Sequence, residues 1–179
     1  AAALHRLQVL FLTDSTAPFV PIIKAFLEAA PRTTFVRALL ALALAQAGDA
    51  AGALAEAEKV PLAHPADSSD EALPLSLGVL ADTAWRIGAP DLAAAVADAL
   101  APFAGQWLVF GQVTATWGPA DRARGLALAA SGQVDAGARL VASARGAAEA
   151  SGAGAWVARC DADLVMLGAR DPSPAPPPG

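Results

Sequence analysis

The chain has 179 residues, of which 55% are hydrophobic, 16% are charged and 6% are aromatic, and its formal net charge is −5. The apolar excess is mostly alanine and leucine, which predicts an all-α protein and argues against a β-sandwich or a disordered chain. No stretch is rich in Lys or Arg, so we expect no direct nucleic-acid contact from this segment.

Helical periodicity and turn residues divide the chain into helices with short breaks between them. Residues 2–12 have the pattern of the middle of a helix, which predicts that the chain is a piece of a longer protein. We assign residues 1–16 to the end of a preceding helix pair and its turn. Helices are then expected over residues 18–29, 34–47, 50–60, 73–87, 90–104, 119–131, 134–151 and 154–168. We place one helical domain at residues 17–170 and a proline-rich tail or linker at residues 171–179.

The segment between Asp98 and Asp121 carries no charge and is long enough to span a bilayer. Prolines and glycines interrupt it, and a lipid-exposed backbone broken at those points would leave peptide groups without hydrogen bonds. We therefore expect no membrane segment but an ordered apolar loop at residues 105–118.

This loop and the helix after it contain four candidate partner-contact residues. Trp107 and Trp117 bracket the loop, which is predicted either to pack as a plug over one face of the domain or to present the two rings to a partner, since Trp is enriched at binding hot spots. Arg122 and Arg124 open the following helix. We interpret them first as part of a solvated face or as a salt bridge to a neighbouring repeat, and a contact for a phosphate or a partner is the alternative that makes them candidate site residues.

The sequence contains no recognisable catalytic, cofactor-binding or metal-binding motif. The glycine-rich stretch at residues 151–156 lacks the lysine of a phosphate-binding loop, and His5 and His64 lie far apart on unrelated elements. Cys160, the single cysteine, lies in an apolar helix and is predicted to be a buried, unreactive thiol. We expect no cofactor and no enzymatic activity within these residues.

Three helix pairs share one internal spacing. In each pair a glycine at the turn is preceded by a small residue seven positions earlier and followed by another five positions later. The turn residues are Gly48, Gly88 and Gly132, and the small residues predicted to pack across them are Ala41 with Ala53, Ala81 with Ala93, and Gly125 with Gly137. Small side chains at these points let the two helix backbones approach closely.

This spacing resembles the tetratricopeptide repeat, a helix–turn–helix unit whose eighth and twentieth positions are small. The resemblance implies a right-handed superhelix of antiparallel helix pairs, a TPR-like α-solenoid, in which Pro65 matches the proline after the second helix. The turn glycines lie 40 and 44 residues apart rather than 34, so each linker is longer than in the family. A non-repeating helical bundle is the alternative.

The order of segments is also similar to the C-terminal repeat region of large bacterial STAND-type signalling ATPases, which carry LuxR-type or related DNA-binding domains or nucleotide cyclase domains. The similarity covers residues 18–168 and is carried by PIIKAFLEAAP, by ALLALALAQAGDAAGALAEAE and by the APFAG and WGPADR elements. It implies a cytoplasmic module that senses a partner or effector and controls an NTPase core outside this chain.

The predicted function is therefore the binding of a protein or peptide, including another domain of the same protein. The alternatives are a structural spacer or oligomerisation element, which would self-associate through uncapped repeat ends, and a part of an ATPase-linked adenylate or guanylate cyclase.

Overall fold

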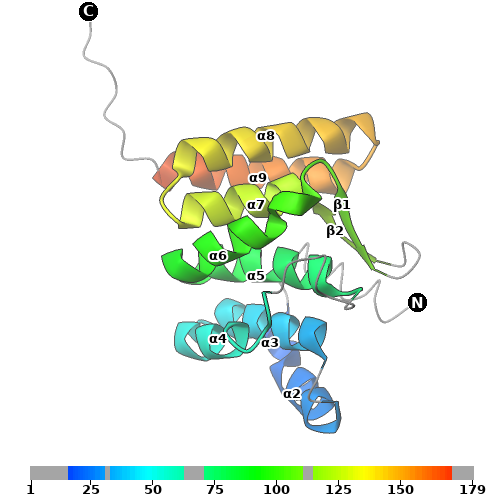
Figure 1. Ribbon diagram of the computed structural model, residues 1–179, viewed down its shortest axis with the longest axis vertical. Coiled ribbons are helices and arrows are strands. Elements are labelled where there is room, and N and C mark those ends of the chain that lie inside the picture. Colours follow the sequence, from blue (N-terminus) through cyan, green and yellow to red (C-terminus); the bar gives the residue numbers. More distant parts are fainter. Residues whose placement is uncertain (1–15, 31–32, 63–70, 111–114, 171–179) are drawn as a thin grey trace, which may run out of the picture.

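The computed structural model describes residues 16–30, 33–62, 71–110 and 115–170 (Figure 1). This part of the chain is mostly helical, which confirms the all-α prediction in its coarse form. A short 3-10 helix η1 (Ala17–Phe19) leads into helices arranged as a stack. These are α2 (Val20–Ala29), α3 (Thr34–Gln46), α4 (Ala50–Ala57), α5 (Leu73–Ile87), α6 (Pro90–Leu100), α7 (Ala120–Ala130), α8 (Val134–Ala150) and α9 (Gly154–Arg170).

The helix boundaries follow the predicted ones closely. The helix predicted over residues 73–87 is confirmed residue for residue. The helix expected over residues 90–104 ends at Leu100 and continues as the 3-10 helix η3 (Ala101–Phe103), because Pro102 has no N–H to donate to the preceding turn. His5, His64, Pro65 and the predicted tail lie outside the described residues.

The three predicted turn glycines adopt the left-handed backbone conformation that favours glycine. Their φ angles are 85° at Gly48, 66° at Gly88 and 98° at Gly132. In each turn the residue after the glycine donates its N–H to the carbonyl five residues back, at 2.9, 3.1 and 2.8 Å respectively. This hydrogen bond is the mark of a Schellman turn, and it folds each second helix back along the first.

The predicted small residues lie where the paired helices touch. Ala41, Ala53, Ala81 and Ala93 are completely buried. A Cβ atom added to Gly125 would lie 2.7 Å from the carbonyl oxygen of Gly137, so α7 and α8 are in backbone contact at this point. The predicted close approach of the two helix backbones is thus observed at Gly125 and Gly137, and the two alanine pairs are buried as close packing requires.

Successive pairs stack on one another in chain order (Figure 1). Helix α5 contacts both α3 and α7, while α4 packs on α5, α6 on α7, and α8 on α9. A continuous apolar core runs through this stack from Ala38 on α3, through Leu80 on α5, to Ala123 on α7 and Trp156 on α9. Among the described residues, no helix is both long enough and apolar enough to cross a membrane.

The expectation of a loop at residues 105–118 is corrected by the structure, which places a β-hairpin there. Strand β1 (Trp107–Phe110) pairs antiparallel with β2 (Ala115–Pro119), with a bulge between Leu108 and Val109. A Cβ on Gly78 of α5 would lie 2.7 Å from Leu108 Cδ1 and 2.9 Å from Trp117 Cδ1, so the hairpin rests directly on that helix. Of the two alternatives for this segment, the packed plug is the one observed.

Candidate functional site

The four predicted partner-contact residues do not form one exposed surface. Arg122 is completely buried and Trp117 is 3% exposed, so the expectation that they face a partner is corrected. Trp107 is half-buried against the core. Arg124 is also half-buried, and its Nε donates to the carbonyl of Ala97 at 3.3 Å.

Arg122 instead lies at the centre of a buried polar network. Its Nη2 and Nη1 donate to Asp82 Oδ1 and Oδ2 at 2.8 and 3.2 Å, and its Nε donates to Asp163 Oδ2 at 2.6 Å. The indole N–H of Trp117 donates to Asp82 Oδ2 at 2.9 Å. Arg159 lies 3.7 Å from an oxygen of each aspartate, so two cations face two anions. Arg122 thus forms a salt bridge to Asp82 of the neighbouring helix pair, as one of its predicted interpretations stated.

The two aspartates respond differently to this shared environment. Burial opposes ionisation of Asp82, but the forked contact with Arg122 outweighs it and holds the pKa of Asp82 below its usual value. Burial raises the pKa of Asp163 because Arg122 gives it a single hydrogen bond and the Asp82 carboxylate is close by. The pKa of Arg122 is raised by the two carboxylates in spite of its burial, so it stays charged.

This network holds structural elements together and is largely shielded from solvent. It connects α5, α7, α9 and β2, and its charged side chains are at most 12% exposed. A buried and internally neutralised cluster has no access to a substrate, so we assign it no acid–base role. Sequence reasoning missed Asp82, although a lone acid inside the apolar run LPLSLGVLADTAWRI was a usable signal.

Neither the single cysteine nor the other acidic and sulfur side chains that the structure describes form a reactive or metal-binding site. Cys160 is fully buried, and burial raises its pKa to about 11, so the prediction of a buried, protonated thiol is confirmed. Within the described residues, no group of three or more His, Cys, Asp or Glu side chains could hold a metal ion.

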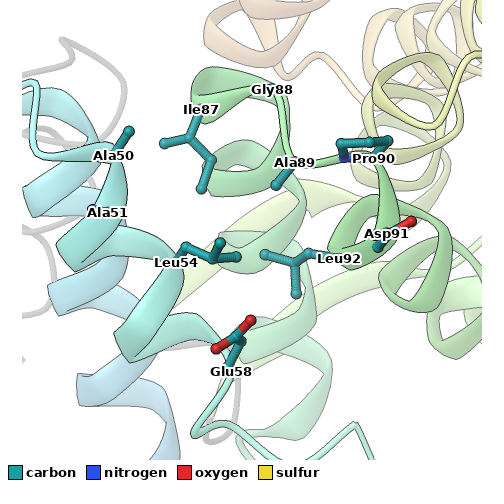
Figure 2. A pocket seen from close by; sticks show the side chains of 10 residues that line it. All are labelled: Ala50, Ala51, Leu54, Glu58, Ile87, Gly88, Ala89, Pro90, Asp91 and Leu92. Carbon is teal, nitrogen blue, oxygen red and sulfur yellow. The ribbon is translucent and has the colours of Figure 1, made fainter.

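The described surface is hollowed between α4 and the turn that joins α5 to α6. This groove has a volume of about 490 Å³ and is open to solvent. It is lined by Ala50, Ala51, Leu54, Glu58, Ile87, Gly88, Ala89, Pro90, Asp91 and Leu92 (Figure 2).

Small residues line part of the groove. Ala50 and Ala51 on α4 face Gly88 and Ala89 across the space, and none has a side chain larger than a methyl group. Larger aliphatic side chains form the walls. Figure 2 shows Leu54 and Leu92 pointing toward each other, with Ile87 beside them; all three are half-buried.

Two acidic residues are among those that line the groove, and Figure 2 shows the carboxylate of Asp91 pointing away from the gap between Leu54 and Leu92. Glu58 follows α4, and Asp91 lies in the first turn of α6, where the helix N-terminus favours a negative charge. Both residues are exposed. Lys59, next to Glu58, is bound instead to Glu56 at 2.7 Å. Among the residues that the structure describes, no Lys, Arg or His lines the groove, but Lys59 and Arg86 each directly adjoin a lining residue.

Comparison with known proteins found no match to a family model, a curated protein or a solved structure.

Proposed function

We propose that this chain is a protein- or peptide-binding module built from TPR-like helix pairs, and that the groove beside α4 is its docking site. The observation that carries the proposal is the apolar groove left open between one helix pair and the next. Stacked helix pairs form extended surfaces of this kind, and their usual role is to bind another protein. The shared turn geometry and the small-residue seams support a TPR-like stack, a right-handed superhelix in the family it resembles.

The resemblance to STAND-type signalling ATPases supports a regulatory role in the cytoplasm. A partner bound to the module would change the activity of an NTPase core by binding one arrangement of the two better than the other. A LuxR-type transcriptional regulator is the parent we favour, with an ATPase-linked cyclase as the alternative. The coding sequence on both sides of residues 1–179 tests this part: a nucleotide-binding loop upstream supports it, and flanking sequence without one contradicts it.

Selection of random displayed peptides on the purified chain tests the binding function. Ala51 is exposed on α4 and lines the groove, so Ala51→Phe fills the groove at little cost to folding. Ala142 is an exposed alanine on α8, away from the groove, and Ala142→Phe is the matched control. We expect peptides that bind the wild type and Ala142→Phe but not Ala51→Phe. Peptides that ignore both substitutions, or no enriched peptides at all, would contradict the proposal.

A structural spacer or oligomerisation element is the second candidate, and a different observation favours it. Large apolar side chains are exposed at both ends of the stack: Ile22 and Phe26 on α2 are 66% and 52% exposed, and Val165 and Met166 on α9 are 72% and 41% exposed. Light scattering over a range of concentrations separates the two candidates. A mass that rises with concentration and returns to the monomer in Val165→Gln favours self-association, whereas a constant monomer mass contradicts it.

A further inference from the structure

We propose that copies of this chain associate end to end, with the exposed side of α9 in one copy packed on the exposed side of α2 in the next. The inference rests on the second candidate function, self-association, and names both contact surfaces; it uses no residue that lines the groove. Three observations support it. Both surfaces are apolar, they hold most of the large apolar side chains that the described residues expose, and the order of stacking makes the two ends complementary.

The exposed side of α9 is apolar along the described part of the helix. Its members are spaced three and four positions apart, which places them on one face of the helix; they are Ala155, Ala158, Ala162, Val165 and Met166, the α9 face. Among the residues of α9 whose exposure the structure describes, Asp161 is the only exposed charged one, and it is bound to Arg145 of α8 at 2.6 Å. A surface helix normally carries charged residues on the side away from its core, so the α9 face has the character of a contact surface.

Helix α2 has an exposed apolar face of its own, beside its buried residues Ile23 and Leu27. The same spacing of three and four connects its members, which are Ile22, Ala25, Phe26 and Ala29, the α2 face. The charged residues Lys24 and Glu28 each follow a large member of this face by two positions. They therefore lie about 200° around the helix from it, and no charge has to be desolvated when the α2 face is covered.

The exposed apolar side chains are concentrated at the two end helices. Of the five large apolar side chains that are exposed among the described residues, four belong to the α2 and α9 faces, and the fifth, Val109, lies on the hairpin. Arrays of helix pairs normally end in a polar outer surface, which keeps them from stacking further. Neither end of this stack has such a surface.

The order of stacking indicates which face covers which. Helix α5 packs on α3, and α7 packs on α5, so each pair meets the preceding pair with one side and the following pair with another. Such a series leaves one side of each kind free, near α2 and near α9, which belong to opposite ends of the stack (Figure 1). The shapes also suit each other, because Ile22 and Phe26 are large while the middle of the α9 face consists of alanine methyl groups. A contact between two different faces is heterologous, and it can be repeated from copy to copy.

The test is to block each face separately and then mix the two variants. Phe26→Glu blocks the α2 face and Val165→Glu blocks the α9 face, and both positions are exposed, so the core is not disturbed. In analytical ultracentrifugation we expect the mass of the wild type to rise with concentration beyond that of a dimer. Each variant alone should associate at least about tenfold more weakly, because a buried charge without a partner is costly. The equimolar mixture should form a 1:1 dimer, since each copy keeps one unblocked face.

The control and the contrary outcomes are as distinct as the expected one. Ala94→Glu adds the same charge at an exposed position of α6, in the middle of the stack, and should associate as the wild type does. If one blocked variant alone still dimerises, the contact joins two identical faces, and the end-to-end inference is overturned while self-association stands. If the wild type is monomeric at every concentration, self-association itself fails. A mixture that stays monomeric also overturns the inference.

Oxidation of Met166 gives a second, independent readout of the α9 face. Met166 is the only methionine of the chain and is 41% exposed, so its conversion to the sulfoxide by hydrogen peroxide can be followed by mass spectrometry. In Phe26→Glu alone we expect rapid oxidation. An excess of Val165→Glu, whose peptide differs in mass, should slow the oxidation of Met166 in Phe26→Glu several-fold. An unchanged rate would overturn the inference.

Discussion

Replacement of Arg122 by Met should be among the most destabilising single changes in this chain. Arg122 is fully buried and donates three hydrogen bonds to two aspartates. Met has a similar length but no charge, so Asp82 and Asp163 would be left facing each other without the cation between them. Breaking a buried ion pair by removing one partner costs about 3–5 kcal/mol. Arg159 stays 3.7 Å from each carboxylate and Trp117 still donates to Asp82, so we expect a loss within that range and not above it.

Urea unfolding followed by circular dichroism measures this loss directly. A domain of this size is stable by about 5–15 kcal/mol, so the variant should keep only part of its stability and melt about 10 °C or more below the wild type. Arg124→Met is the matched control, because Arg124 is half-buried and makes one hydrogen bond of 3.3 Å to a backbone carbonyl. We expect the control to lose less than about 1.5 kcal/mol.

The pH dependence shows whether the orphaned carboxylates cause the loss. Without Arg122 the pKa values of Asp82 and Asp163 rise above those in the wild type, and a group whose folded-state pKa is raised destabilises the protein until the pH falls far enough to protonate it. The difference in the free energy of unfolding between variant and wild type should therefore shrink as the pH falls from about 7 to about 4.5. The double variant Arg122→Met, Asp163→Asn leaves one anion, Asp82, facing one cation, Arg159, and should recover part of the loss at neutral pH. A difference in stability that is constant with pH, or no recovery in the double variant, would refute the reasoning.

Three further changes test the packing. Gly125→Ala should cost about 1–3 kcal/mol in urea unfolding because its Cβ would meet the backbone of α8, whereas Gly146→Ala, in open space on the same α8, should be neutral or stabilising by up to about 1 kcal/mol. Gly78→Ala should cost a similar 1–3 kcal/mol, about what Gly125→Ala costs, because Leu108 and Trp117 occupy the space of its Cβ; equal stability would contradict the direct contact. Cys160 should resist a thiol reagent at about pH 8 until the protein unfolds, because burial raises its pKa to about 11; rapid labelling of the folded chain would show that the thiol is accessible.

The helix pairs could be predicted from the sequence because each depends on neighbouring residues. A turn glycine such as Gly88 and the apolar period of α5 both act within a few residues, and these local signals set the helix boundaries. The hairpin was missed because its strands are short and lie in a segment of glycines and prolines that is typical of a loop. Its β-branched and aromatic residues, Trp-Leu-Val-Phe and Ala-Thr-Trp, were the available signal.

The buried network and the groove could not be predicted from local sequence patterns. Asp82 and Asp163 lie 40 and 41 residues from Arg122, and only the stacking of three helices brings them together. Arg122 follows a proline and an acid at a helix start, which is typical of an exposed residue, so its burial depends on tertiary structure. The groove is lined by residues of two helix pairs, including Ala50, Ala51 and Gly88, and no local sequence pattern indicates that they lie around one open space.

The network around Arg122 also limits how this stack could be lengthened or shortened. Arrays of helix pairs normally tolerate duplication or excision of a pair, because each pair contacts only its neighbours through similar surfaces. Here the second pair contributes Asp82, the third contributes Arg122, and α9 contributes Asp163. Excision of α5 and α6 would remove Asp82 and leave Arg122 with one of its two carboxylates. Insertion of a new helix pair between α6 and α7 would separate Asp82 from Arg122. We therefore expect this section of the chain to tolerate engineering only as one unit, not as interchangeable helix pairs.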